Sequence, residues 1–217
     1  EVYIVEEPMA GAIGAKLPVL EAIGTMVLDI GAGTTDIAVI ALGGTVASAS
    51  SQVAGDRFND NIIDFVRSEF QLAIGERTAE ETKIAIGAVL PLAEPLERAI
   101  RGRDLATGLP REVILTDAHV REALAPSLDS LMETMKDVIE RTPPELLSDV
   151  LERGVTVFGG GAQLRGLPEL LSKMLGVPVH VAPEPLTAVV RGTGIITENP
   201  RLWGDIFLHE DAILPQS

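Results

Sequence analysis

A pair of apolar segments joined by a glycine-rich turn is the feature that most constrains the fold. Residues 25–30 (TMVLDI) and 36–42 (DIAVIAL) both have strand character, and GAGTT separates them. Strands separated by so short a glycine-containing segment predict an antiparallel hairpin. A third segment, TVASASSQV at 45–53, follows Gly43 and Gly44. We therefore expect a meander of three antiparallel strands.

Helical patterns follow the meander. Asp56 stands before apolar residues that recur at helical spacing up to Phe70, and its side chain is able to cap such a helix. A second helix is expected from Thr78. Prolines and glycines interrupt residues 91–110, and RGRDLATGLPREVILT predicts a hairpin whose last strand is Val113–Thr116.

A long amphipathic helix is expected next, with Asp117 as its cap. Its apolar residues fall on one stripe at steps of four and three: Val120, Leu124, Leu128, Leu131, Met135 and Val138. The stripe favours packing against the core of the chain. A coiled-coil partner is the alternative, although the heptads are few.

The last third of the chain alternates strands and helices, which is typical of an α/β fold. A helix over 142–154 precedes a buried strand at 155–158, and a further helix has Leu167, Leu170, Leu171 and Met174 on its inner face. A strand at 177–181 and a helix over 185–197 close the pattern. At the other end, Val2–Val5 predicts a short strand and MAGAIGAKL a helix of small residues suited to close packing. The tail from Glu198, with Trp203, has no clear period and is expected to be a loosely docked extension.

Composition excludes several classes of function. With 17 basic and 32 acidic residues, the net charge of -15 repels nucleic acid and anionic lipid. Cysteine is absent, so a disulfide framework and a thiol nucleophile are excluded. His119, His180 and His209 are scattered without ligand spacing, so we assign no metal site to them. No apolar run is long enough for a spanning helix.

The beginning of the chain predicts that this sequence starts inside a longer protein. Its first residue is Glu1 in place of Met, and EVYIVEEP has neither a basic start nor an apolar signal segment. We expect either a partial gene or an expressed fragment.

The segment LDIGAGTTDIAV has the composition of a phosphate-binding loop. Glycines let backbone N–H groups approach phosphate oxygens closely, and the hydroxyls of Thr34 and Thr35 add donors for a terminal phosphate or an attacking water. Asp29 is suited to hold Mg²⁺ through water, because Mg²⁺ prefers oxygen ligands and retains several waters. Taken alone, the segment favours a plain hairpin whose glycines only form the turn.

A second glycine-rich turn strengthens the case for a nucleotide site. FGGGAQLRGLPEL places Gly159, Gly160 and Gly161 between a buried strand and a helix, where N–H groups and the positive helix end receive a nucleotide. A run of three glycines is by itself a weak signal.

Six segments, in order from residue 1 to about 196, resemble the second half of the MreB family of bacterial actin-like filament ATPases: VEEPMAGAIGAKLP, MVLDIGAGTTDIAVIALGG, GERTAEETKIAIG, RGRDLATGLP, RTPPELLSDVLERGVTVFGGGAQLRGL and PLTAVVRGTG. The segments GERTAEE, RGRDLATGLP and TPPEL are the specific ones. The glycine turns are shared with actins, heat-shock chaperone ATPases and sugar kinases.

The resemblance implies a site for ATP and Mg²⁺. It implies that the second phosphate-binding loop consists of Asp29, Gly31, Ala32, Gly33, Thr34, Thr35 and Asp36, and the adenosine-side loop of Gly159, Gly160 and Gly161. Glu7 matches the residue that positions the hydrolytic water, with helix capping after Pro8 as the alternative. Glu80 and Lys83 match residues that contact ribose and adenine, and otherwise form an ordinary solvated ion pair.

Two departures from the family pattern fall in the first loop. The family carries a glycine where this chain has Ala32, whose Cβ would crowd the loop if φ were positive there. The family also carries a glutamate at the position of Asp36.

The implied fold is the second domain of an actin-like α/β protein, with a ribonuclease H-like mixed sheet and flanking helices. Residues 1–54 and 146–197 are expected to form the main subdomain, 55–145 a smaller inserted α/β subdomain, and 198–217 a C-terminal extension. The first phosphate loop and the membrane-contact loop of the family belong to an N-terminal half that we expect to be absent here. The resemblance therefore implies an ATPase in the parent protein and no turnover by these residues alone.

The function implied for the parent protein is ATP-dependent polymerisation into membrane-associated filaments that control rod shape. They would lie in the cytoplasm at the inner face of the membrane, contact themselves and cell-wall elongation membrane proteins, and guide cell-wall synthesis. We expect no nucleic-acid partner, and membrane contact only through the N-terminal half. Two alternatives remain at this point: a non-catalytic interaction module, and a fragment of a small-molecule kinase of the same superfamily, for which no second catalytic acid is evident.

Overall fold

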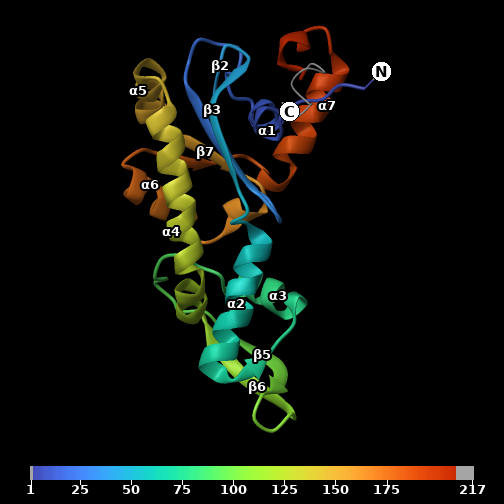
Figure 1. Ribbon diagram of the computed structural model, residues 1–217, viewed down its shortest axis with the longest axis vertical. Helices are drawn as coiled ribbons and strands as arrows, with labels where there is room; N and C mark the ends of the chain where they lie inside the picture. Colours follow the sequence, from blue (N-terminus) through green and yellow to red (C-terminus); the bar gives the residue numbers. More distant parts are fainter. Residues whose placement is uncertain (1, 209–217) are drawn as a thin grey trace, which may run out of the picture.

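The computed structural model describes residues 2–208 and forms two lobes stacked along one long axis (Figure 1). The upper lobe contains a five-stranded sheet and the lower lobe a three-stranded sheet. His209 and the rest of the expected extension to residue 217 lie outside the described residues. The predicted division of the chain at residues 54 and 146 stays a prediction.

The upper sheet has the strand order β3-β2-β1-β7-β8. Strands β1 (Thr25–Ile30), β2 (Thr35–Ala41) and β3 (Gly44–Ser51) form the predicted antiparallel meander. Strands β7 (Val155–Phe158) and β8 (Val179–Val181) add to it in parallel. The expected mixed sheet of an α/β fold is thereby confirmed.

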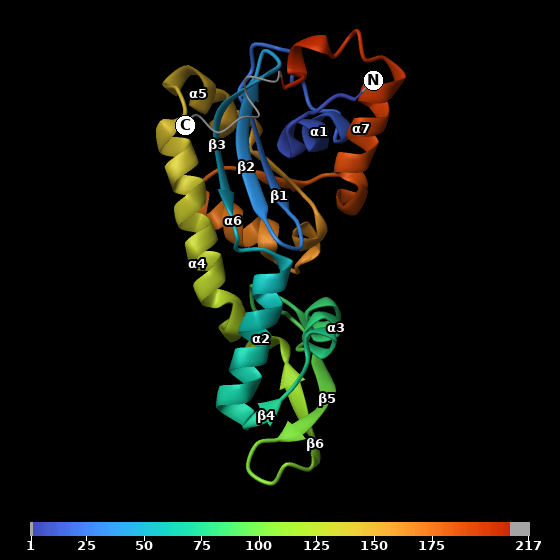
Figure 2. The ribbon, with the colours of Figure 1, turned by 45° about the vertical axis from the view of Figure 1, so that its right-hand side comes forward.

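Helices cover both faces of this sheet (Figure 2). Helices α1 (Glu7–Gly14) and α7 (Ala188–Glu198) pack on one face. The other face is covered by α4 (Asp117–Arg141), α5 (Pro144–Arg153) and α6 (Leu167–Leu175). The predicted stripe of α4 is buried throughout, so the helix packs on the core of its own chain.

The lower lobe is built between β3 and α4. It contains α2 (Gly55–Phe70), β4 (Leu72–Ala73), α3 (Glu76–Ile86), and the hairpin of β5 (Glu97–Asp104) and β6 (Pro110–Thr116). One cluster of buried apolar side chains runs from the upper sheet through α2 and α4 into this lobe. The two lobes therefore share a continuous core.

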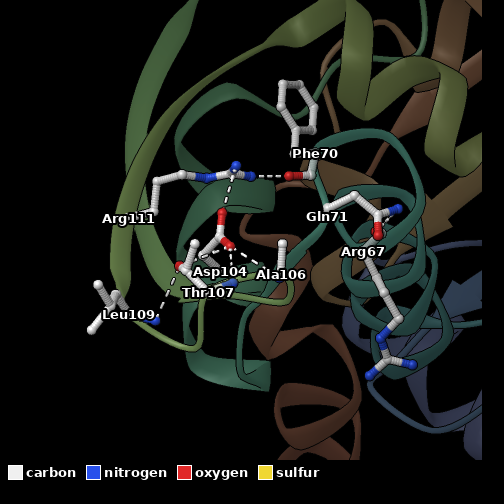
Figure 3. A network of polar contacts seen from close by, with 8 residues as sticks. All are labelled: Arg67, Phe70, Gln71, Asp104, Ala106, Thr107, Leu109 and Arg111. Atoms are coloured by element: carbon white, nitrogen blue, oxygen red, sulfur yellow. Dashed lines mark hydrogen bonds and ion pairs between the residues drawn. The ribbon is translucent and has the colours of Figure 1, made fainter.

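Asp104 fastens the tip of the β5–β6 hairpin (Figure 3). One carboxylate oxygen accepts hydrogen bonds from the backbone of Ala106 and from the backbone and hydroxyl of Thr107. The other lies 2.7 Å from the guanidinium of Arg111, which also donates to the carbonyl of Phe70 at the end of α2. Hydrogen bonds from Thr107, above all, lower the pKa of Asp104, so this cluster is charged at neutral pH.

Several local expectations were wrong. Val2–Val5 forms no strand, because no strand among the described residues pairs with it. The N-caps are Ala54 for α2 and Thr116 for α4, in place of Asp56 and Asp117. Thr116 caps α4 in a reciprocal pair with His119, whose ring nitrogen accepts from the Thr116 backbone.

Three smaller expectations also differ from the structure. Helix α3 begins at Glu76, two residues before the expected Thr78. Met174 is 40% exposed, since it points away from the inner face of α6. The segment after Glu198 docks firmly as far as Leu208: Ile206 is 6% exposed, and Trp203 and Phe207 pack against the apolar layer of α1 and α7.

No helix within residues 2–208 combines the length and apolar character needed to cross a membrane.

Helices α1 and α7 cross with their backbones in contact. A Cβ built on Gly192 would lie 1.7 Å from the carbonyl oxygen of Ala10, and one on Gly14 would lie 1.8 Å from that of Ala188. Neither position has room for a methyl group. The close packing predicted from the small residues of α1 is thus present, and Gly14 is needed because α7 lies directly against it.

We expect Gly192→Ala to lower the free energy of unfolding by about 2 kcal/mol or more, because the added methyl forces the two helices apart. Gly194→Ala is the matched control, since a Cβ there meets nothing within 4 Å. That variant should be neutral or stabilising, as alanine is the better helix former. Urea unfolding measures the stability of both variants. Equal stabilities would contradict the close backbone contact between α1 and α7.

Candidate functional site

The β1–β2 turn is closed by a hydrogen bond from the N–H of Gly31 to the carbonyl of Thr34, 2.9 Å long. The backbone at Ala32 is not in the left-handed region, so the condition under which its Cβ would crowd the loop is not met. A Cβ on Gly33 would meet nothing within 4 Å, and its φ is not positive either. The packing of the chain itself therefore does not require glycine at position 33.

The two threonines of the loop have different surroundings. The side chain of Thr35 is buried, and its hydroxyl donates to the carbonyl of Val53 at 2.6 Å. Thr34 is exposed, and its hydroxyl donates to Asp36 at 3.1 Å. In this conformation Thr35 joins β2 to the segment before α2, and Thr34 is the threonine available to a ligand.

Asp29 lies at the end of β1, opposite Asp36 on β2. Its side chain is 4% exposed. Burial, followed by the negative charges of Glu7 and Asp36, raises the pKa of Asp29 to about 7. The negative charges of Glu7 on α1 and Asp36 on β2 thus act on Asp29 at this edge of the sheet, and a cation placed beside Asp29 would offset them.

The second glycine turn follows β7, the parallel neighbour of β1. Gly159 has φ +83°, and a Cβ on it would lie 2.4 Å from both a carboxylate oxygen of Asp29 and the carbonyl of Ile30. Glycine is therefore required there so that the two turns can touch. Gly160 and Gly161 lead into a short 3-10 helix (Gly160–Gln163), with α6 beginning only at Leu167.

Glu80 and Lys83 lie on the face of α3 that points toward the start of α2. Nζ of Lys83 lies 2.6 Å from a carboxylate oxygen of Glu80 and donates to the carbonyl of Gly55 at 2.9 Å. The Lys83 side chain is only 12% exposed. Burial raises the pKa of Glu80, but hydrogen bonds from Lys83 and Asn59 outweigh it and hold the pKa below its ordinary value. The pair is therefore not an ordinary solvated one.

A cavity of about 990 Å³ lies among these segments. Its volume falls at the upper end of the range found for ligand sites. The predicted residues Gly31, Ala32, Glu80, Lys83, Gly160 and Gly161 line it. The other predicted residues are not among those that line it: Glu7, Asp29, Gly33, Thr34, Thr35, Asp36 and Gly159.

The sequence reasoning missed two cavity residues with distinctive contacts. Asn59 on α2 is 2% exposed, although polar. Arg165, just after the 3-10 helix, donates to the carbonyls of Ile84 and Gly87 at the end of α3, both at 3.2 Å. The available signal for Asn59 was an amide on the otherwise apolar face of an amphipathic helix. Nothing in the local pattern pointed to Arg165.

A family model described as MreB/Mbl protein matches residues 1–204. The chain belongs to the MreB/Mbl family. It is 48% identical over 198 residues to the cell shape-determining protein Mbl of Bacillus subtilis (strain 168), covering 91% of this chain and 60% of that protein. It is also 48% identical over 211 residues to the cell shape-determining protein MreB of Escherichia coli (strain K12), covering 97% and 61%. The chain thus spans about 60% of the length of these curated relatives.

Solved structures give the same result for the fold. MreB 5 of Spiroplasma citri bound to AMPPNP superposes with a TM-score of 0.88 at 35% identity, covering 91% of this chain and 59% of that one. The same protein bound to ADP gives the same TM-score, covering 93% and 60%. The actin-like fold expected for this MreB/Mbl chain is confirmed.

The raised pKa of Asp29 predicts a specific dependence of stability on pH. A carboxyl group whose pKa is higher in the folded chain than in the unfolded chain retains its proton longer when folded, so stability falls as pH rises from about 4 to about 7. Asp29→Asn removes this contribution. The variant should gain stability relative to the unchanged chain across that window, with a constant difference above it.

Urea unfolding at several pH values between 4 and 8 measures this difference. Asp60→Asn, at an exposed position of α2, controls for the loss of one negative charge. A stability difference between Asp29→Asn and the unchanged chain that did not vary with pH would contradict the assignment.

Proposed function

We propose that this chain contributes one wall of an ATP site in an actin-like protein that polymerises and helps to determine cell shape. The observation that carries the proposal is the cavity of about 990 Å³ bounded by the two glycine turns and by the ion pair of α3. The structures of MreB 5 with AMPPNP and with ADP support it. A cavity with a glycine-rich wall and a polar, charged wall suits a ligand with a phosphate end and a nucleoside end.

The proposed orientation follows from the chemistry of the walls. The phosphates would lie against Gly31–Thr34, where backbone N–H groups and the hydroxyl of Thr34 are available. The nucleoside would lie between α3 and Gly160–Gly161. Glu80 and Lys83 would then contact the ribose and the base.

The acidic edge of the sheet fits the Mg²⁺ that this proposal implies. No group of three or more metal-ligating side chains within residues 2–208 is arranged to hold an ion. Mg²⁺ commonly needs only one or two carboxylates, with waters and phosphate oxygens as its other ligands. Asp29, whose charge is opposed by Glu7 and Asp36, would hold the ion through water, and the ion would neutralise the phosphate charge.

For hydrolysis, we assign to Glu7 the alignment of a water molecule. Glu7 is exposed in the first turn of α1 and lies near enough to Asp29 to raise the pKa of that carboxyl group. A carboxylate in that position can accept a hydrogen bond from a water molecule and so align it. Turnover would require a second wall to close over the phosphates and exclude solvent.

Gly33 gives a direct test of the phosphate loop. Gly33→Ala should leave the stability of the chain unchanged, because the added Cβ meets nothing. It should weaken ATP binding by about tenfold, since it keeps phosphate oxygens from the backbone N–H groups. Adenosine binding should not change.

Isothermal titration with ATP and with adenosine measures both effects. Gly204→Ala, at another open glycine far from the cavity, is the matched control. If Gly33→Ala bound ATP as tightly as the unchanged chain, the loop would not hold phosphates.

Two features of the chain, an exposed apolar hairpin and a second cavity, support polymerisation. The β5–β6 hairpin exposes Leu105, Leu109 and Ile114 at the lower end (Figure 1). A second cavity of about 440 Å³ lies in the upper lobe, with Leu17, Met26 and Val181 among its lining. A protruding apolar tip and a hollow elsewhere on the same chain generate head-to-tail contacts that do not close, and such contacts form filaments.

We expect Leu109→Asp and Val181→Asp each to reduce assembly strongly, because each introduces a charge into an apolar contact. Pelleting of the protein that carries this chain, with Mg-ATP, measures assembly. Val190→Asp is the control, at an apolar position of α7 that is as exposed as Leu109. Normal pelleting of both end variants would exclude this mode of contact.

The remaining parts of the proposal rest on membership of the MreB/Mbl family. We propose that the filaments lie in the cytoplasm along the inner face of the membrane and cooperate with membrane proteins of cell-wall elongation. The net charge of -15 gives this chain no attraction to anionic lipid. Membrane contact is therefore assigned to other residues of the protein.

A further inference from the structure

Asn59 is a buried polar residue that the fold does not explain. It lies in the second turn of α2, lines the large cavity and is 2% exposed. Its side-chain oxygen is buried without a hydrogen-bond partner. An unsatisfied buried acceptor destabilises a folded chain, so an apolar residue of similar size would serve packing better.

The contact that Asn59 does make is with Glu80. A hydrogen bond between its side chain and the Glu80 carboxylate is one of the causes that lower the pKa of Glu80. The orientation of the amide is fixed by this contact, because a carboxylate only accepts and would repel the amide oxygen. The side-chain oxygen of Asn59 is therefore left without a partner because the amide nitrogen is directed toward Glu80.

Glu80 is thereby held from two elements. Lys83 binds it from the next turn of α3, and Asn59 binds it from α2. The Glu80 side chain remains 43% exposed. It is an ionised, fixed acceptor with lone pairs left for a ligand, which suits a group that presents hydroxyl donors.

We propose that Asn59 is a positioning residue that orients Glu80 to accept hydrogen bonds from a ribose, and so sets a preference for ribonucleotides over deoxyribonucleotides. This inference rests on the proposed nucleotide site and adds to it the basis of sugar selectivity. A site built to pair with a hydroxyl rejects the analogue that lacks it, because its own polar group is then left unpaired.

The decisive variant is Asn59→Leu, which keeps the side-chain volume and removes both polar atoms. Stability should be unchanged or higher, because the unsatisfied oxygen is gone. Sugar selectivity should fall, because Glu80 loses one of its two anchors. A purely structural asparagine would give the opposite result, with lower stability and unchanged selectivity.

Asn61 provides the matched control on the same helix. Its amide donates to the carbonyl of Ala123 at 3.0 Å, and its oxygen accepts from the hydroxyl of Ser127 at 3.2 Å. Asn61→Leu should therefore lower stability and leave selectivity unchanged. The two substitutions are chemically identical and differ only in the groups that the asparagine side chain contacts.

The experiment titrates this chain with ADP, 2′-deoxy-ADP and 3′-deoxy-ADP in the presence of Mg²⁺, and measures urea unfolding in parallel. We expect the ratio of deoxy to ribose dissociation constants to fall by about threefold or more in Asn59→Leu, for at least one of the two analogues. The pKa of Glu80, followed by NMR, should rise in the same variant. An unchanged ratio would overturn the inference while leaving nucleotide binding intact. Failure of the unchanged chain to bind ADP would overturn the proposed function, and the inference with it.

Discussion

The parallel pairing of β1 with β7 is the interaction on which the rest of the structure depends. The register places Asp29 opposite Phe158, so that the two strands end together and the two glycine turns leave the same edge of the sheet. The contact between Gly159 and Asp29 is possible only because of this register. Segments about 130 residues apart thus form one side of the cavity, at the carboxyl ends of strands where α/β proteins commonly bind ligands.

The lower lobe supplies the opposite side of the cavity, and its placement depends on a few polar contacts above a shared apolar core. Lys83 binds the carbonyl of Gly55, and Arg165 binds the last carbonyls of α3. Because α3 carries both Glu80 and Lys83, these contacts fix the charged wall relative to the glycine turns. Lys83 therefore belongs both to the proposed nucleotide site and to the contacts that join the two lobes.

The sequence predicted most of the fold, because the elements of the upper lobe have strong local signals. The β1 strand was predicted with its observed bounds, since an apolar run between a glycine and a glycine turn leaves little ambiguity. Capping was predicted poorly: Asp56 and Asp117 have the right chemistry, but the chain enters each helix one or two residues earlier. The strand expected at Val2–Val5 is absent because an apolar sequence forms a strand only where another strand lies beside it to pair with.

The candidate site was predicted unevenly for a related reason. Motifs located the glycine turns and the Glu80–Lys83 pair, since these residues are close in sequence. Motifs did not distinguish the buried Thr35 from the exposed Thr34, because the carbonyl of Val53 that binds Thr35 comes from a distant segment. Asn59 was missed because its contact is with Glu80 on another helix, which the local sequence pattern does not reveal.

The firm docking of the last described residues has a mechanical consequence. The rings of Tyr3 and Phe207 stack with centroids 4.5 Å apart, and the N–H of Leu208 donates to the carbonyl of Ile4. Both ends of the described chain therefore meet at one corner, beside the crossing of α1 and α7. Polypeptide attached at either end would leave from the same point, so tension between the two attachments would not be transmitted through the central sheet. The two neighbouring ends make this fold a natural candidate for circular permutation.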